Sequence, residues 1–136
     1  MRLNPMLTFN GQCEAAFKFY AQCLGGKIAT MLSYGDSPMA EQVPPEWRDK
    51  IVHATLYAGD MVLMGNDSPP EHYEETKGFS VVLGIADPAD AERTFHALAE
   101  NGTVRMPLQQ TFWSPGFGML TDQFGIPWMI NFEQAR

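Results

Sequence analysis

Residues 12–24 read QCEAAFKFYAQCL, and Gly25-Gly26 follows directly. The stretch predicts a helix, because apolar residues recur along it at helical spacing and the two glycines act as a stop signal. This helix decides the fold, because strand-like segments lie on both sides of it and the same order of elements recurs later in the chain. The apolar side of the helix is formed by Ala16, Tyr20, Cys23 and Leu24.

Strand-like segments lie on either side of this helix. Each is rich in β-branched residues or alternates apolar with other residues, which is typical of strands. Together with the helix they predict the order βαβββ. The segments are LNPMLTF (3–9), KIATMLSY (27–34), KIVHATLY (50–57) and MVLMGN (61–66).

The second half of the chain repeats this order. One offset places Glu14 on Asp90, and the same offset places Tyr20 on His96. His96 is therefore expected to have a packing or surface role. The matching segments are FSVVLGI (79–85), the helix DPADAERTFHALAENG (87–102), VRMPLQQTF (104–112), GFGMLTD (116–122) and PWMINF (127–132).

The later strands of the two halves match with a shorter offset, which places Thr55 on Thr121 and Leu63 on Met129. The difference between the two offsets arises in residues 34–49. This segment is a longer loop in the first half and holds three of the ten prolines. Long loops between strands can cover a binding site, so this loop is a candidate lid.

A chain of 136 residues has the length of one domain and can bury a core. We predict a single domain, 1–136, with module one at 1–67, a connector at 68–77 and module two at 78–136. The connector holds Glu71, His72 and Glu75, which are metal-ligand types. A solvated linker is the favoured interpretation, because no apolar scaffold would position them.

The composition excludes several classes of partner. The formal net charge is -7, and the nine Lys and Arg residues are scattered, so nucleic acid is not expected to bind. No apolar stretch approaches the ~20 residues of a membrane span, and no secretion signal is evident. We expect a cytoplasmic protein. Cys13 and Cys23 lie about 15 Å apart on one helix, so buried thiols are favoured over a reactive pair.

Three blocks carry a family resemblance: LTFNGQCEAAFKFY (7–20), KIVHATLYAGDMVLMGND (50–67) and GTVRMPLQQTFWSPGFGMLTDQFGIPWMIN (102–131). The chain resembles the vicinal oxygen chelate superfamily of glyoxalase, bleomycin-resistance and extradiol dioxygenase proteins, and its PhnB-like branch most closely. The resemblance implies an α+β fold of paired βαβββ modules, whose curled mixed sheets carry their helices outside and enclose a ligand cavity. It also implies a homodimer.

In metal-dependent relatives, the first and last strands of each module supply His, Glu or Gln to one divalent ion. Carried over to this sequence, those positions hold no imidazole or carboxylate. We therefore predict no bound metal and no cofactor. The residues at these positions are Asn4 or Pro5, Leu63, Ser80 or Val81, and Met129.

The segment KIVHATLY is expected to turn His53 and Thr55 toward the cavity, because side chains alternate between the faces of a sheet. The expected counterparts in module two are Met119 and Thr121. His53 could act as a hydrogen-bond donor, a general base or a metal ligand. A core histidine bonded to a neighbour is the alternative.

Aromatic side chains are expected at the mouth of the pocket. Phe112 and Trp113 end one predicted strand, Phe117 begins the next, and Trp47 lies on the candidate lid. Such rings could stack on a planar or apolar ligand. They could equally fill the core or a dimer seam. Met129 and Asn131 would add an adaptable apolar contact and an amide.

The leading prediction is a metal-free small-molecule-binding protein, a homodimer whose unknown ligand is aromatic or apolar. The alternative is a metal-dependent lyase, isomerase or dioxygenase of the same superfamily with non-standard ligands. A structural module with a filled cavity is a third possibility. No nucleotide-binding loop or nucleophile elbow supports other chemistry. The predicted ligand-binding residues are His53, Thr55, Trp113, Phe117, Met119, Thr121, Met129 and Trp47.

Overall fold

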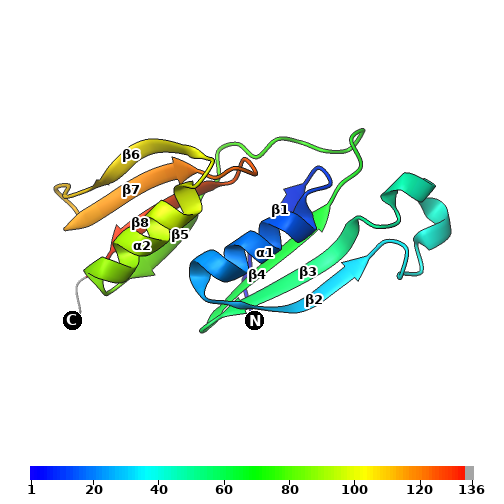
Figure 1. Ribbon diagram of the computed structural model, residues 1–136, viewed down its shortest axis with the longest axis horizontal. Helices are drawn as coiled ribbons and strands as arrows, with labels where there is room; N and C mark the ends of the chain where they lie inside the picture. The colour runs from blue at the N-terminus through cyan, green and yellow to red at the C-terminus, as the bar shows by residue number, and fades with distance from the viewer. Residues whose placement is uncertain (134–136) are drawn as a thin grey trace. The chain divides into compact units, whose positions relative to one another are not determined.

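A computed structural model describes residues 1–133 of the protein. The chain divides into two compact units, the first at Met1–Glu74 and the second starting at Glu75. Each unit contains one four-stranded mixed sheet and one helix packed on it (Figure 1). Neither helix within residues 1–133 is long and apolar enough to cross a membrane. The predicted α+β fold of paired βαβββ modules is confirmed.

The first unit has the sheet order β1-β4-β3-β2, in which β1 and β4 run parallel and the other neighbours are antiparallel. Two short 3-10 turns, η1 and η2, lie in the loop between β2 and β3. The elements are β1 (Met6–Phe9), α1 (Cys13–Leu24), β2 (Lys27–Ser33), η1 (Ala40–Gln42), η2 (Pro45–Trp47), β3 (Ile51–Ala58) and β4 (Met61–Asp67).

The second unit repeats this topology with the order β5-β8-β7-β6, and its parallel pair is β5 and β8. Its helix begins at Pro88 after the N-cap Asp87, whose side chain accepts a hydrogen bond from the backbone N–H of Ala89. The elements are β5 (Val81–Ile85), α2 (Pro88–Ala99), β6 (Thr103–Gln109), β7 (Gly116–Thr121) and β8 (Pro127–Phe132).

Each helix approaches its sheet closely where a strand carries glycine. A side chain on Gly65 would collide with the ring of Phe17, and one on Gly118 would lie 2.6 Å from the ring of Phe95. Both phenylalanines are buried, as is Trp128 on β8. The two cores therefore lie between each helix and its own sheet.

The register of the strands corrects one predicted correspondence between the halves. Thr55 pairs with Thr30 on β2, and Met119 pairs with Met106 on β6, across the same bulge in each sheet. The counterpart of Thr55 is therefore Met119, and the expected match with Thr121 is wrong by two residues. Likewise, the counterpart of His53 is Phe117, not Met119.

The error arises at the turn before the last strand of each unit. Ala58 pairs with Met61 around a tight turn, whereas Thr121 pairs with Pro127 around a longer one. Gly59 and Gly125 in these turns match at the predicted offset, but the strands on either side of the turns do not.

A one-residue error affects the last strands and the helices. Met64 pairs with Thr55 as Met129 pairs with Met119, so Met64 is the counterpart of Met129. Leu63, the predicted counterpart, belongs to the opposite face and is buried.

The helices show the same error. Tyr20 is fully buried, but the side chain of His96 is 71% exposed, so the two do not correspond. Phe95, buried at the matching position of a helix of equal length, takes the place of Tyr20. Of the packing or surface role expected for His96, its exposure supports the surface role.

The strand predicted over 104–112 ends earlier than expected, since β6 stops at Gln109. The hydroxyl of the buried Ser114 donates to the carbonyl of Gly116 at 2.8 Å, and the N–H of Thr111 donates to the carbonyl of Ser114 at 2.9 Å. These bonds bend the chain before β7. Phe112 and Trp113 therefore lie in a loop.

Candidate functional site

The predicted strand residues lie on the face of each sheet that is turned away from its own helix, which we call the helix-free face. On β3, Ala54 and Leu56 are buried on the α1 side, so His53 and Thr55 lie on the helix-free face. On β7, Gly118 contacts the α2 side. The helix-free face of the second unit therefore carries Phe117, Met119, Thr121 and, on β8, Met129.

His53 and Thr55 form a polar pair on the first unit. The Nε2 atom of His53 lies 3.2 Å from the Oγ1 atom of Thr55, and the donor depends on the tautomer of the ring. His53 is half-buried and Thr55 is buried. Because Nε2 is engaged by the hydroxyl of Thr55, Nδ1 is the ring nitrogen that a ligand could contact.

A second polar pair lies beside the first on the same face. The hydroxyl of Thr8 on β1 donates to Oδ1 of Asn66 on β4 at 2.8 Å. The two residues are register partners across the parallel strands. This pair was not predicted from the sequence, although Asn66 and Asn131 lie in similar places near the ends of the last strands.

Thioether side chains lie side by side on both helix-free faces. Met6 pairs with Met64 in the first unit, and Met119 pairs with Met129 in the second. Met6 is 46% exposed. Methionine is flexible and polarizable, so these side chains can adapt to ligands of different shape.

Three of the four predicted aromatic residues are brought together. The ring of Trp113 lies 5.3 Å from that of Phe117 in an edge-on arrangement, and Phe112 lies 4.6 Å from Trp113. Trp113 is 54% exposed, so it is not a core residue. The cluster presents ring surface next to the helix-free face of the second unit.

Thr121 has a partner that the sequence did not indicate. The Nε atom of Arg105 on β6 donates to Oγ1 of Thr121 at 2.8 Å. The hydroxyl of Thr121 can still donate to a ligand, because it accepts this bond. Arg105 brings a positive charge to that end of the face.

Trp47 lies in η2 and is half-buried. The loop that carries it is closed at its base, where Tyr34 N–H donates to Lys50 O at 2.8 Å and Gly35 N–H donates to Arg48 O at 2.7 Å. The predicted lid is thus a folded loop with a fixed base. Its role as a lid stays a prediction.

The buried carboxylate of Asp67 holds this end of the first unit together. Its Oδ1 accepts from the N–H groups of Gly11 and Cys13 at 3.0 and 2.9 Å, and its Oδ2 accepts from Ile51 N–H at 2.9 Å. The backbone carbonyl of Asp67 also accepts from the hydroxyl of Tyr34 at 2.7 Å. Burial raises the pKa of Asp67, and the three N–H donors oppose that shift.

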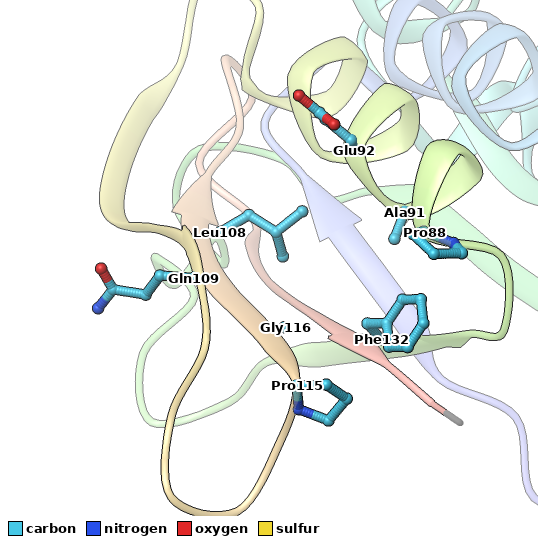
Figure 2. A pocket seen from close by; sticks show the side chains of 8 residues that line it. All are labelled: Pro88, Ala91, Glu92, Leu108, Gln109, Pro115, Gly116 and Phe132. Carbon is cyan, nitrogen blue, oxygen red and sulfur yellow. The ribbon is translucent and has the colours of Figure 1, made fainter.

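The helix side of the second unit has a groove of about 360 Å³ between α2 and β6. Figure 2 shows the side chains of Leu108 and Phe132 on its sheet side, with Glu92 on the helix above. An adjoining hollow of about 370 Å³ shares Glu92 and Leu108. Neither is lined by any of the eight predicted site residues. The groove is lined by Pro88, Ala91, Glu92, Leu108, Gln109, Pro115, Gly116 and Phe132.

The residues present do not fit the divalent ion that metal-dependent relatives hold. Among residues 1–133, no group of three or more His, Cys, Asp or Glu side chains is arranged to bind a metal. At the last-strand positions, the helix-free faces carry Met64 and Met129, whose thioethers are poor ligands for hard divalent ions. His53 has Thr55 rather than a carboxylate beside it.

The paired βαβββ modules define the class of protein as glyoxalase-like in fold. Comparison of the sequence with family models agrees. Residues 2–130 match the Glyoxalase/Bleomycin resistance protein/Dioxygenase superfamily, and the chain belongs to this superfamily.

Individual relatives are similar along their whole length. Protein YjdN of Escherichia coli K12 is 36% identical over 139 residues, covering 96% of this chain and 95% of the relative. The crystal structure of protein PA1353 from Pseudomonas aeruginosa is 49% identical, has a TM-score of 0.90 and covers 99% of both chains. A PhnB protein from Bacillus cereus, 24% identical with a TM-score of 0.82 over 98% of this chain and 100% of its own, shares the fold.

Proposed function

We propose that the protein binds a small, largely apolar or aromatic molecule without a metal ion, on the helix-free faces of its sheets. The proposal rests chiefly on one observation: these faces combine adaptable thioethers with a few polar groups that converge on the same surface. In the first unit, Met64 lies next to Thr55, which is bonded to His53. Ligand sites are typically apolar surfaces with a small number of placed polar groups.

The helix-free faces suit a ligand better than the groove beside α2. The groove offers carbon surface and the carboxylate of Glu92, whose side chain is 70% exposed. An exposed charge in water contributes little affinity. His53 is half-buried and Thr55 is buried, so their polar atoms are worth more to a ligand.

Binding is tested by titration of the protein with planar aromatic probes while tryptophan emission is recorded. Trp113 is expected to report, because its ring is half-exposed and contacts Phe117. Trp113→Ala should weaken binding several-fold while lowering stability by less than about 1 kcal/mol, as for other surface residues. A large loss of stability with unchanged affinity would instead show that Trp113 is a packing residue.

The absence of a required metal is tested by elemental analysis of protein purified without an affinity tag. We expect far less than one divalent ion per chain. Stoichiometric zinc, nickel, manganese or iron that survives dialysis would overturn the metal-free proposal and favour the alternative of a metal-dependent enzyme.

We also propose that the protein acts in the cytoplasm as a homodimer. Edge strands β1 and β5 expose Met6 and Val82, the latter to 57%, and exposed apolar edges are commonly covered by a partner. Light scattering should give twice the chain mass of 15.2 kDa. A particle of the single-chain mass at micromolar concentration would contradict the dimer.

A further inference from the structure

One buried polar atom has no partner within the described chain. The Oδ1 atom of Asn131, on β8, accepts no hydrogen bond from residues 1–133. A buried amide oxygen that has lost water without gaining a donor costs folding free energy. Such an atom in a binding face is a candidate contact for a ligand.

The counterpart of Asn131 in the first unit does have a hydrogen-bond donor beside it. Asn66 is the counterpart of Asn131, and its Oδ1 accepts from the hydroxyl of Thr8. In the second unit, the register partner of Asn131 on the parallel strand is Gly84, which has no side chain. The donor supplied by the protein in one unit is therefore missing in the other.

The surroundings of Asn131 select the kind of group that could replace the missing donor. Phe117 is its partner on β7, and Phe117 contacts the exposed ring of Trp113 at 5.3 Å. A side chain on Gly84 would collide with the carboxylate of Glu133, so that carboxylate lies over the same glycine. The site thus offers aromatic surface and acceptor oxygens, and the carboxylate disfavours an anion.

We propose that Asn131 determines specificity, with its Oδ1 accepting a hydrogen bond from the hydroxyl or N–H of a neutral or cationic aromatic ligand packed against Phe117. This inference rests on the proposed function, because it requires that the helix-free face of the second unit binds a ligand. It goes further in naming the ligand class: phenols and aromatic amines, not aromatic carboxylates or plain hydrocarbons.

The test uses two probes that differ in one donor, 2-naphthol and 2-methoxynaphthalene, each titrated at neutral pH. We expect the wild type to bind 2-naphthol about tenfold more tightly, because the ether leaves the amide oxygen unpaired. In Asn131→Leu the ratio should fall to about one. Asn66→Leu is the matched control, and it should keep the tenfold preference because its amide is already bonded to Thr8.

Stability gives a second readout that does not need a ligand. Asn131→Leu should melt no lower than the wild type, since it removes an unpaired polar atom, whereas Asn66→Leu should melt lower because it leaves Thr8 without its partner.

Equal affinity of the wild type for both probes would overturn this inference and leave the proposed function standing. Failure of both probes to bind would overturn both proposals. Loss of the preference in Asn66→Leu would place the donor contact in the first unit and also overturn the assignment to Asn131.

Discussion

The two units share a topology but fill the space between helix and sheet differently. In the first unit, Phe17 is fully buried and lies 6.3 Å from the ring of Phe9 and 6.0 Å from that of Tyr20. In the second, the matching helix position holds Glu92, and a groove of about 360 Å³ remains. The same topology therefore tolerates either a filled or an open region between helix and sheet at this helix position.

The units also differ in how they use a buried aspartate. Asp67 joins the end of β4 to the start of α1 and the start of β3. Asp122 organises the turn before β8, where it accepts from Phe124 N–H, Ile126 N–H and the indole N–H of Trp128. One carboxylate bridges distant segments, and the other ties a local turn. Four predictions test this contrast between the units.

The largest effect is expected at Asp67. Asp67→Ala leaves the N–H groups of Gly11, Cys13 and Ile51 unpaired, and each such buried donor costs about 1–3 kcal/mol. The free energy of unfolding in urea should fall by about 5 kcal/mol.

Hydrogen exchange should then show which unit is affected. Asp67→Ala should deprotect α1 and β3 more than α2 and β7, and Asp122→Ala should show the reverse. Asp36→Ala is a control at an exposed loop residue and should change stability little. Equal deprotection of both units by either variant would remove the contrast.

The second prediction concerns the filled and open grooves. Phe17→Ala should destabilise by about 3–5 kcal/mol, the usual cost of truncating a buried phenylalanine. Glu92→Ala at the matching position should change stability by less than about 0.5 kcal/mol, because that side chain is 70% exposed. Chemical denaturation of both variants measures the difference. Similar losses in the free energy of unfolding for the two variants would mean that Glu92 contributes as much to stability as the buried Phe17 does.

The sequence predicted the topology because each element follows a clear local rule. The spacing of Ala16, Tyr20 and Cys23 indicates a helix, and the alternation in KIVHATLY indicates a strand. It also placed His53 and Thr55 on the face opposite Ala54 and Leu56, as the structure has them. A register error of two residues, as in the match of Thr55 to Thr121, leaves the face unchanged because side chains alternate with a period of two.

An error of one residue has a different result, since it moves a side chain to the other face. Leu63 was matched to Met129, but it is Met64 that shares the helix-free face. The sequence could not settle this offset, because the length of each turn depends on hydrogen bonds such as those made by Asp122. The pair of Thr8 and Asn66 was missed for a related reason: the parallel pairing of β1 with β4 joins residues far apart in the chain.

The third prediction is a difference in alkaline sensitivity. Burial raises the pKa of the Cys13 thiol well above its usual range, and the negative charges of Asp67 and Glu14 act in the same direction. The contribution of the buried, protonated Cys13 thiol to the free energy of unfolding is fully present below the unfolded-state pKa of about 8.5. As pH rises above that value, the unfolded chain loses its proton first, so stability should fall by up to about 1.4 kcal/mol per pH unit.

Denaturant unfolding at several pH values between about 8 and 10 measures this slope. Cys13→Ala and Cys13→Ser should both lack the Cys13 contribution, because neither side chain ionises in this range. The first residue of α2 is Pro88, which has no thiol, so the effect is assigned to the first unit. A slope that is unchanged in both variants would show that another group causes the alkaline loss.

The smallest effect on stability is expected at His53, where the contrast between the units bears on function. Its counterpart on β7 is Phe117, so the fold does not require an imidazole at this position. His53→Gln should keep the free energy of unfolding within about 1 kcal/mol, the scale of one hydrogen bond to Thr55. Because the helix-free face would lose a placed polar group, affinity for an aromatic probe should fall several-fold, as measured by tryptophan emission. Phe117→Leu is the matched change in the second unit and should weaken binding through lost ring contact. If His53→Gln unfolds much more easily but binds as the parent does, His53 is a core histidine, and the binding face of the first unit must be sought elsewhere.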